Sequence, residues 1–280
     1  MPEITAATVR ALRERTGLPM MDCKKALTEC QGDQEAAVDL LRKQGLKVSP
    51  VESNRPTAFG RMGLFADLQA KSGAMVELKC ESASVARFDE FVQLAQDLAQ
   101  QLALGPGADD AEALLDQPSP SQPGKTLRDQ RDELKNRIRE VFRILRMVRF
   151  DGACSGYSHN SGTVSGVLLQ VKGSSEEAAR NICMHVAAMR PKSLSVEELD
   201  PAIVARERSV LTEAARAEGK PESIIDKMVE GRMRNFYAES VLREQPYVKD
   251  DKQSVGQYAK SEGLDLVRFA HWELEPDDKD

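Results

Sequence analysis

The feature that most constrains the fold is a change of hydrophobic period, from two residues to between three and four. Apolar residues alternate over 62–68 and again over 76–80, with Ser72-Gly73 between them. This pattern predicts a β-hairpin with its turn at Ser72-Gly73. Apolar residues then recur at helical spacing over 91–102, and Gly105-Pro106-Gly107 ends that helix.

The same change of period recurs further along the chain. Val148 and Phe150 can begin a strand, 164–171 can form another, and Ser174 with Glu177 reads as a capping box that opens a helix. A hairpin followed by a helix, twice over, predicts an α+β core of two related halves. The two halves share no significant residue identity.

Three short helices are expected before this core. Apolar residues recur at helical spacing from residue 4 to 41, Gly17 follows the first helix, and Asp33 stands where the third needs an N-cap. Gly45 would end the third helix. We therefore expect a helical module over 1–46 and a polar linker with two prolines over 47–60.

Two further helical segments are expected outside the repeated pattern. Residues 105–125 are rich in Pro, Ser and Asp and predict a long surface excursion, followed by a charged helix with an apolar stripe over 127–145. A capping box at Ser195 and Glu198, and Pro221 in a first turn, predict a helical hairpin. The expected organisation is core halves at 61–147 and 148–195, the hairpin at 196–243, and a return to the core over 244–280.

Composition narrows the classes of partner. The chain has 280 residues, five widely spaced cysteines and a net charge of −6, and no apolar stretch approaches the roughly 20 residues of a membrane span. The start of the sequence does not resemble a signal or transit peptide. We expect a cytoplasmic protein that binds another protein, with no nucleic acid or membrane partner.

Motifs for chemistry are incomplete. Gly124-Lys125-Thr126 ends like a phosphate-binding loop, but position 119 is Ser119 where that motif needs its first glycine. Prolines nearby remove amides that the loop would need. A solvated loop before a helix is therefore favoured.

One cysteine and three histidines remain as candidates. Cys154 lies between Gly152 and Gly156 with His159 nearby, a pattern that leaves a thiol hydrolase open. Residues 156–162, however, are expected to form an irregular connection between strands, whereas a cysteine nucleophile needs a strand-to-helix turn. No histidine has a partner at metal-ligand spacing, and His185 fits a buried, hydrogen-bonded side chain. We expect no enzyme activity, no metal and no cofactor.

Particular strings resemble the translation elongation factor Ts family, and they agree with it in order and spacing from residue 3 to about 270. They are Leu12-Arg13-Glu14-Arg15-Thr16-Gly17, Met20-Met21-Asp22-Cys23-Lys24-Lys25-Ala26-Leu27, Met184-His185-Val186-Ala187-Ala188-Met189-Arg190-Pro191, Lys227-Met228-Val229-Glu230-Gly231-Arg232 and Glu244-Gln245-Pro246-Tyr247-Val248. The resemblance implies an N-terminal module like the ubiquitin-associated domain, a two-part α+β core and an inserted helical hairpin.

The resemblance also implies a function. Members of this family bind elongation factor Tu, displace its magnesium ion, expel GDP and yield to GTP, without a nucleotide site of their own. By position, contacts of the N-terminal module with the partner would come from Arg13, Met20, Met21 and Lys24. His159 would be a contact in the second core half.

The resemblance fails at one segment. Where the family usually has Thr-Asp-Phe-Val-Ala, this chain has Ser82, Ala83, Ser84, Val85 and then Ala86. We hypothesise that this loop still docks near the partner's magnesium site, with help from Phe88 or Phe91.

Two alternatives stay open. An adaptor of the ubiquitin-associated class would fit the first 45 residues alone, although the loop at Thr16 to Met20 differs from that of ubiquitin-binding relatives. A homodimer through the helical hairpin also stays open.

Overall fold

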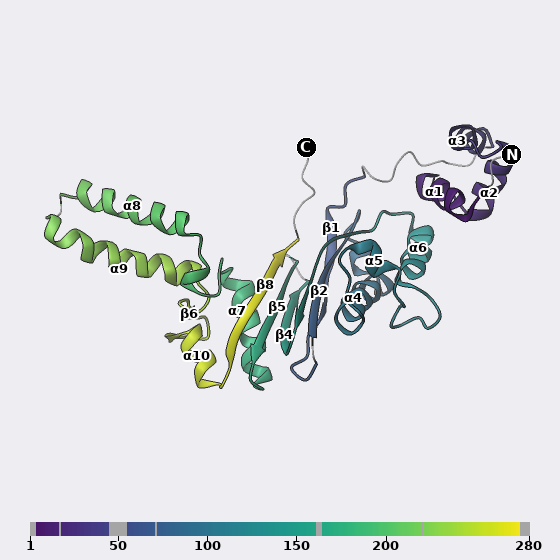
Figure 1. Ribbon diagram of the computed structural model, residues 1–280. Helices are drawn as coiled ribbons and strands as arrows, with labels where there is room; N and C mark the ends of the chain where they lie inside the picture. Colours follow the sequence, from purple (N-terminus) through teal and green to yellow (C-terminus); the bar gives the residue numbers. More distant parts are fainter. Residues whose placement is uncertain are drawn as a thin grey trace. The chain divides into compact units, whose positions relative to one another are not determined.

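The structure is a computed structural model that describes residues 4–16, 18–44, 55–70, 72–160, 164–219 and 221–274. The chain divides into two compact units, Met1–Pro56 and Thr57–Asp280. Each unit is described by itself below, and Figure 1 labels most of the helices and strands of both.

The first unit contains three helices, α1 (Ala6–Thr16), α2 (Met20–Glu29) and α3 (Gln34–Lys43). Their inward residues form one small core that includes Leu12, Leu27 and Leu41. The Asp33 carboxylate accepts hydrogen bonds from the amides of Glu35 and Ala36 at 2.9 and 3.1 Å. The predicted N-cap is therefore confirmed, whereas the predicted stops at Gly17 and Gly45 lie outside the described residues.

The second unit begins with a three-stranded antiparallel sheet in the order β1 (Phe59–Phe65), β2 (Ser72–Cys80), β3 (Arg143–Asp151). The turn expected at Ser72-Gly73 is wrong, because both residues already belong to β2 and pair with β3. The chain instead turns just after Asp67, whose carboxylate accepts a hydrogen bond from the Gln69 amide. The short side chains at 72 and 73 serve close packing: Ser72 is buried and donates to the Ala103 carbonyl.

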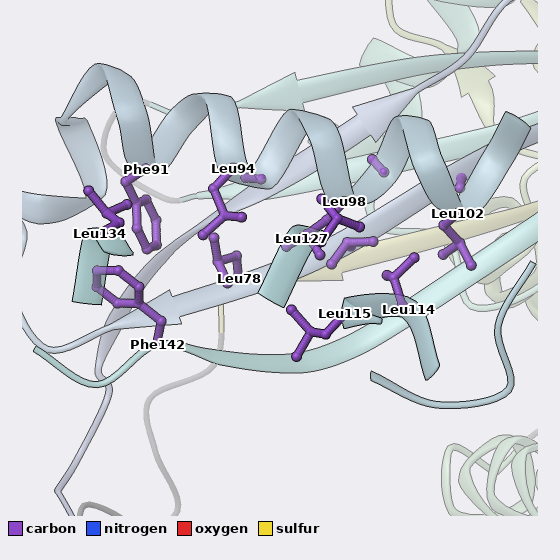
Figure 2. Close-up of a cluster of buried hydrophobic side chains, with 14 of the residues drawn as sticks. Leu78, Phe91, Leu94, Leu98, Leu102, Leu114, Leu115, Leu127, Leu134 and Phe142 are labelled. Carbon is purple, nitrogen blue, oxygen red and sulfur yellow. The ribbon is translucent and has the colours of Figure 1, made fainter. Parts of the chain in front are cut away.

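Helix α4 (Asp89–Leu104) covers one face of this sheet with the apolar stripe that the sequence predicts. At Gly63 a Cβ would lie 1.9 Å from the Ala95 carbonyl oxygen, so only glycine permits this approach of strand and helix. Figure 2 shows Phe91, Leu94, Leu98 and Leu102 of α4 pointing into the core.

The segment 105–125 is not wholly the surface excursion that its composition suggests. It contains the short helix α5 (Ala111–Leu115), whose Leu114 and Leu115 are fully buried in the same core. Two leucines outweigh the many polar neighbours because burying each removes a large apolar area from water. Figure 2 shows both leucines below α4.

The charged helix is shorter than predicted. Helix α6 (Leu127–Ile138) ends at Arg139, which has the left-handed φ of 63°, and Val141 and Leu145 lie beyond it. Leu145 belongs to β3, and Val148 and Phe150 also pair with β2 rather than with the second half. Apolar residues at 138, 141 and 145 fit the period of a helix, but pairing with β2 decides the outcome.

The second half repeats the layout with the sheet order β4 (Cys154–His159), β5 (Ser165–Lys172), β8 (Asp265–Glu273) and helix α7 (Glu176–Met189). The connection expected over 156–162 is in part a strand, because β4 extends to His159. The Ser174 capping box is also wrong, since Ser175 precedes α7 and makes no side-chain cap. Side chains including Met75, Phe150, Cys154 and Leu168 fill the space between the two sheets.

The predicted helical hairpin consists of α8 (Pro201–Ala217) and α9 (Glu222–Ser240), which share a core of Ala215, Ile225, Val229 and Met233. Its first helix starts later than predicted. Residues Val196–Glu198 form a separate 3₁₀ turn, η3, and Asp200 caps α8 by accepting a hydrogen bond from the Ala202 amide. The Glu198 carboxylate instead accepts from the Leu194 amide.

After the hairpin the chain returns through β6 (Pro246–Tyr247), β7 (Asp250–Ser254) and α10 (Val255–Ser261) to β8. Helix α10 packs on α7 and β8, so the return completes the second core. Within the described ranges, every helix is too short or too polar to cross a lipid bilayer.

Candidate functional site

The segment between β2 and α4, residues 81–88, is the first candidate surface, and we call it the β2–α4 connection. It contains the 3₁₀ turn η2 (Val85–Arg87). Ala83 and Ser84 are exposed and Ser82 is half-buried, whereas Val85 is only 3% exposed. Of the four residues expected to touch a partner, Val85 is therefore an anchor in the core.

Reciprocal hydrogen bonds fix the base of this connection. The Glu140 carboxylate accepts from the amides of Glu81 and Ser82 at 3.2 and 3.1 Å, and the Glu81 carboxylate accepts from the Val141 amide at 2.6 Å. The segment after α6 and the β2–α4 connection therefore hold each other in place. Bonds between a carboxylate and an amide are stronger than bonds between neutral groups.

A cation and a thiol support the rest of the connection. The Arg61 guanidinium, on β1, donates to the Ala86 carbonyl at 3.0 Å. The Cys80 thiol lies 3.3 Å from the Ser82 carbonyl, and burial raises the pKa of Cys80 to about 12. The thiol thus stays protonated and donates to this carbonyl.

The two phenylalanines that the sequence offers beside this connection differ in environment. Phe91 is fully buried and meets Phe142 edge to face, with ring centroids 5.1 Å apart. Figure 2 shows both rings inside the core. Phe88 is 44% exposed and lines a surface hollow with Val85 and Ile138. Only Phe88 can contact another protein without unfolding of the core.

A further aromatic residue was missed by sequence reasoning. Phe59 is 43% exposed and pairs with Cys80 at the end of β2 from which the β2–α4 connection leaves. The strand pattern read from the sequence starts at Met62, so Phe59 fell in the predicted linker. Its aromatic side chain beside Gly60 in an otherwise polar segment was the available signal.

His159 lies at the same end of the two-sheet core. His159 is the last residue of β4 and pairs with Ser165 on β5, which pairs in turn with Glu273 on β8. The side chain of the following residue, Leu274, packs against Gly60 on β1. The His159 ring is exposed, and its Nδ1 lies 3.1 Å from the Tyr157 hydroxyl. The second unit therefore brings the β2–α4 connection, Phe59, Phe88 and His159 to one end.

The first unit carries a surface of its own. Met20 and Met21 are 50% and 63% exposed on α2, and Lys24 is exposed one turn later. Arg13, on α1, is half-buried. Exposed methionines are adaptable contacts for another protein. The opposite face of α2 packs Cys23, Ala26 and Leu27, so Met20 does not belong to the core of this unit.

The candidates for chemistry have structural roles. Thr126 caps α6 in a capping box with Asp129, and the Lys125 ammonium lies 2.5 Å from the Glu133 carboxylate. Gly124-Lys125-Thr126 is thus the loop that leads into α6, as the sequence predicts.

Cys154 and His185 are both buried. Burial raises the pKa of Cys154 to about 11, and this residue is on a strand, so it lacks the exposed thiolate that a nucleophile needs. His185 Nε2 lies 2.9 Å from the Gln245 amide oxygen, and Nδ1 accepts from the Val248 amide at 3.2 Å. These bonds confirm the predicted buried, hydrogen-bonded histidine. In the part of the chain that the structure describes, no three His, Cys, Asp or Glu side chains gather as metal ligands.

Comparison with known proteins gives one consistent result. The family model described as "Elongation factor TS" matches residues 70–275. A protein named elongation factor Ts from Methylococcus capsulatus is 41% identical over 274 residues, which cover 97% of this chain and 92% of the relative. One of the same name from Saccharopolyspora erythraea is 40% identical over 278 residues, covering 98% and 99%.

Proposed function

The chain belongs to the elongation factor Ts family of translation elongation factors, and on that premise we propose that it is a guanine-nucleotide exchange factor for elongation factor Tu. In this role it binds the GDP-bound GTPase, disturbs the magnesium site and promotes release of GDP. GTP then displaces the factor.

The observation that carries this proposal is the β2–α4 connection. It presents Ala83 and Ser84 to solvent while Val85 and the Glu140 carboxylate hold its base. A segment that is already ordered loses little conformational freedom when it binds. Such a segment can press on a partner's nucleotide site and keep its own shape.

Exchange follows from a difference of affinities. The factor must bind the nucleotide-free GTPase more tightly than the GDP-bound form, and by the same coupling GDP weakens the grip of the factor. This step forms and breaks no covalent bond on the chain. All nucleotide and metal chemistry belongs to the partner.

The first unit supplies a second contact in this proposal. Met20, Met21 and Lys24 lie together on the exposed side of α2, and the half-buried Arg13 on α1 would add a charged contact. An arrangement like the ubiquitin-associated domain suits this use, because it offers one helix surface on a small independent core. In the second unit, exposed His159 adds a polar contact.

The connection acts in this chain without the Asp-Phe pair usual in the family. Backbone groups of 82–84 and the residues around them replace the missing side chains. The small size of Ala83 and Ser84 lets the partner approach the backbone closely.

Release of a fluorescent GDP from elongation factor Tu, with and without the chain, tests the proposal. We expect the release rate to rise with chain concentration and then to saturate. Changing Met20 and Met21 together to Ala raises the concentration needed, whereas Met189→Ala, at an exposed methionine on α7, leaves it unchanged. An unchanged release rate, with no complex on a sizing column, would refute the proposal.

A further inference from the structure

Exposed aromatic side chains are not scattered over this molecule. All eight phenylalanines, the four tyrosines and the single tryptophan lie in the described ranges, and among them only Phe59 and Phe88 are exposed, at 43% and 44%. Both flank the β2–α4 connection: Phe59 pairs with Cys80 just before it, and Phe88 is its last residue. Two exposed aromatic residues at one end of the core indicate a binding surface.

The position of Phe88 adds an independent argument. Phe88 is the N-cap of α4, with the extended φ and ψ of −67° and 134° that a capping residue adopts, yet its side chain makes no cap hydrogen bond. Asn, Asp, Ser and Thr are the favoured residues there, because their oxygens accept from free amides of the first turn. The chain forgoes that stabilisation at the start of its longest core helix in the first half. A residue that lowers stability at an exposed site is typical of a functional position.

The surroundings of Phe88 fit an apolar anchor. The hollow beside its ring is lined by the apolar residues Val85 and Ile138 and by the charged pair Glu90 and Arg137, whose side chains lie 2.9 Å apart. Protein interfaces combine apolar contacts with polar and charged ones. Aromatic residues are common anchors in such interfaces.

We propose that Phe59 and Phe88 form the apolar anchor by which the chain holds its partner GTPase, and that the small side chains of Ala83 and Ser84 in the β2–α4 connection allow close approach. The inference rests on the proposed exchange function and deepens it. The partner contributes an apolar patch that covers both rings, and the hollow beside Phe88 receives one of its side chains. The two phenylalanines supply affinity, while the backbone of 82–84 contacts the region of the partner's nucleotide site.

The test uses the full chain and the nucleotide-free form of elongation factor Tu. Phe88→Asn provides the cap that α4 lacks and removes the ring, so it raises the thermal unfolding temperature and lowers the affinity together. We expect the dissociation constant to rise about tenfold, and about 100-fold when Phe59→Ala is added. A merely structural role for Phe88 could not move stability and affinity in opposite directions.

Leu104→Ala is the matched control. Leu104 is 56% exposed at the far end of α4, about 24 Å along the helix from Phe88. We expect its dissociation constant to stay within about twofold of the wild type.

The two possible failures, of the phenylalanine anchor and of the exchange function, give different results. If the wild type accelerates GDP release and both phenylalanine variants bind as tightly as it does, the anchor is wrong and the exchange function stands. If the wild type neither binds the partner nor accelerates release, the exchange function itself is wrong.

Discussion

The two halves of the core take the same step from a strand to a helix in different ways. Between β2 and α4 lie eight residues, 81–88, whereas between β5 and α7 lie three, 173–175. In the second half, Gly173 has a φ of 122°, and a Cβ there would lie 2.4 Å from the Gly263 carbonyl oxygen. The connection between β5 and α7 is thus short and packs tightly against the chain at Gly263. The β2–α4 connection is longer and exposes Ala83 and Ser84 to solvent.

The helices that follow are anchored alike, so the longer connection does not reflect a looser first half. Helix α4 buries Phe91, Leu94 and Leu98, and α7 buries Ile182 and Val186, all with no exposed surface. A segment displayed on a rigid base is the usual way in which folds carry binding residues. The difference between the halves is consistent with our proposal that the first connection is a main contact with the partner.

Removing the buried ring that packs α4 onto its sheet should have the largest effect on stability. Phe91→Ala deletes a fully buried ring and should lower the free energy of unfolding by about 3–5 kcal/mol, as measured by chemical denaturation. Phe88→Ala should lower it by less than about 1 kcal/mol, because that ring is largely solvated. Equal losses from the two changes would mean that both rings are structural.

The contrast between the two connections predicts the next largest effect. Gly173→Ala should cost about 1–3 kcal/mol of unfolding free energy, because alanine is strained at this φ and its Cβ meets the Gly263 carbonyl. Ala83→Ser, in the exposed connection, should stay within about 0.5 kcal/mol of the wild type. An unchanged free energy of unfolding in Gly173→Ala would show that the connection between β5 and α7 is not tightly packed.

Much of this arrangement could be predicted from sequence, because apolar period reports which face of an element is buried. The stripe on α4 follows from this spacing, whereas the Asp33 cap and the hairpin of α8 and α9 follow from residue types typical of helix starts. The pairing of strands cannot be predicted in this way. We did not predict β4 or the start of β3, because short segments of mixed polarity become strands only when a neighbouring strand is present.

The candidate site could be predicted from sequence only in part, for a related reason. The position of the β2–α4 connection follows from the family resemblance, but its support by Glu140 joins residues about 60 positions apart. The apolar stripe over 91–102 predicts that Phe91 is buried, but only the structure shows that Phe88, just before α4, is exposed. Phe59 gains its meaning only from its register opposite Cys80.

Restoring the family's usual side chains sharpens the account of the first connection. Ala83→Asp combined with Ser84→Phe should change the rate of GDP release from elongation factor Tu by less than about tenfold, or 1.4 kcal/mol. The reason is that, in the proposed mode of binding, backbone groups of 82–84 and the flanking aromatic residues already contact the partner. A very large rise from a nearly inactive wild type would contradict this account, with Ala83→Ser as the control.

The smallest effect concerns the core of the second half, where burial lowers the pKa of His185. As pH falls through about 6.5, the unfolded chain binds a proton that the folded chain does not, so the free energy of unfolding decreases. Burial lowers the pKa of His271 in the same direction. Unfolding at about pH 7.5 and about pH 5.5 should show a smaller difference in His185→Gln than in the wild type. An equal difference would exclude His185 as a source.

Hydrogen exchange of the chain, free and bound to nucleotide-free elongation factor Tu, tests the central claim most directly. The account predicts that amides of residues 82–88 exchange more slowly in the complex, while those of 173–175 exchange at the same rate in both states. A stable complex in which 82–88 gain no protection would contradict it, because the longer connection would then not be the part of the core that holds the partner.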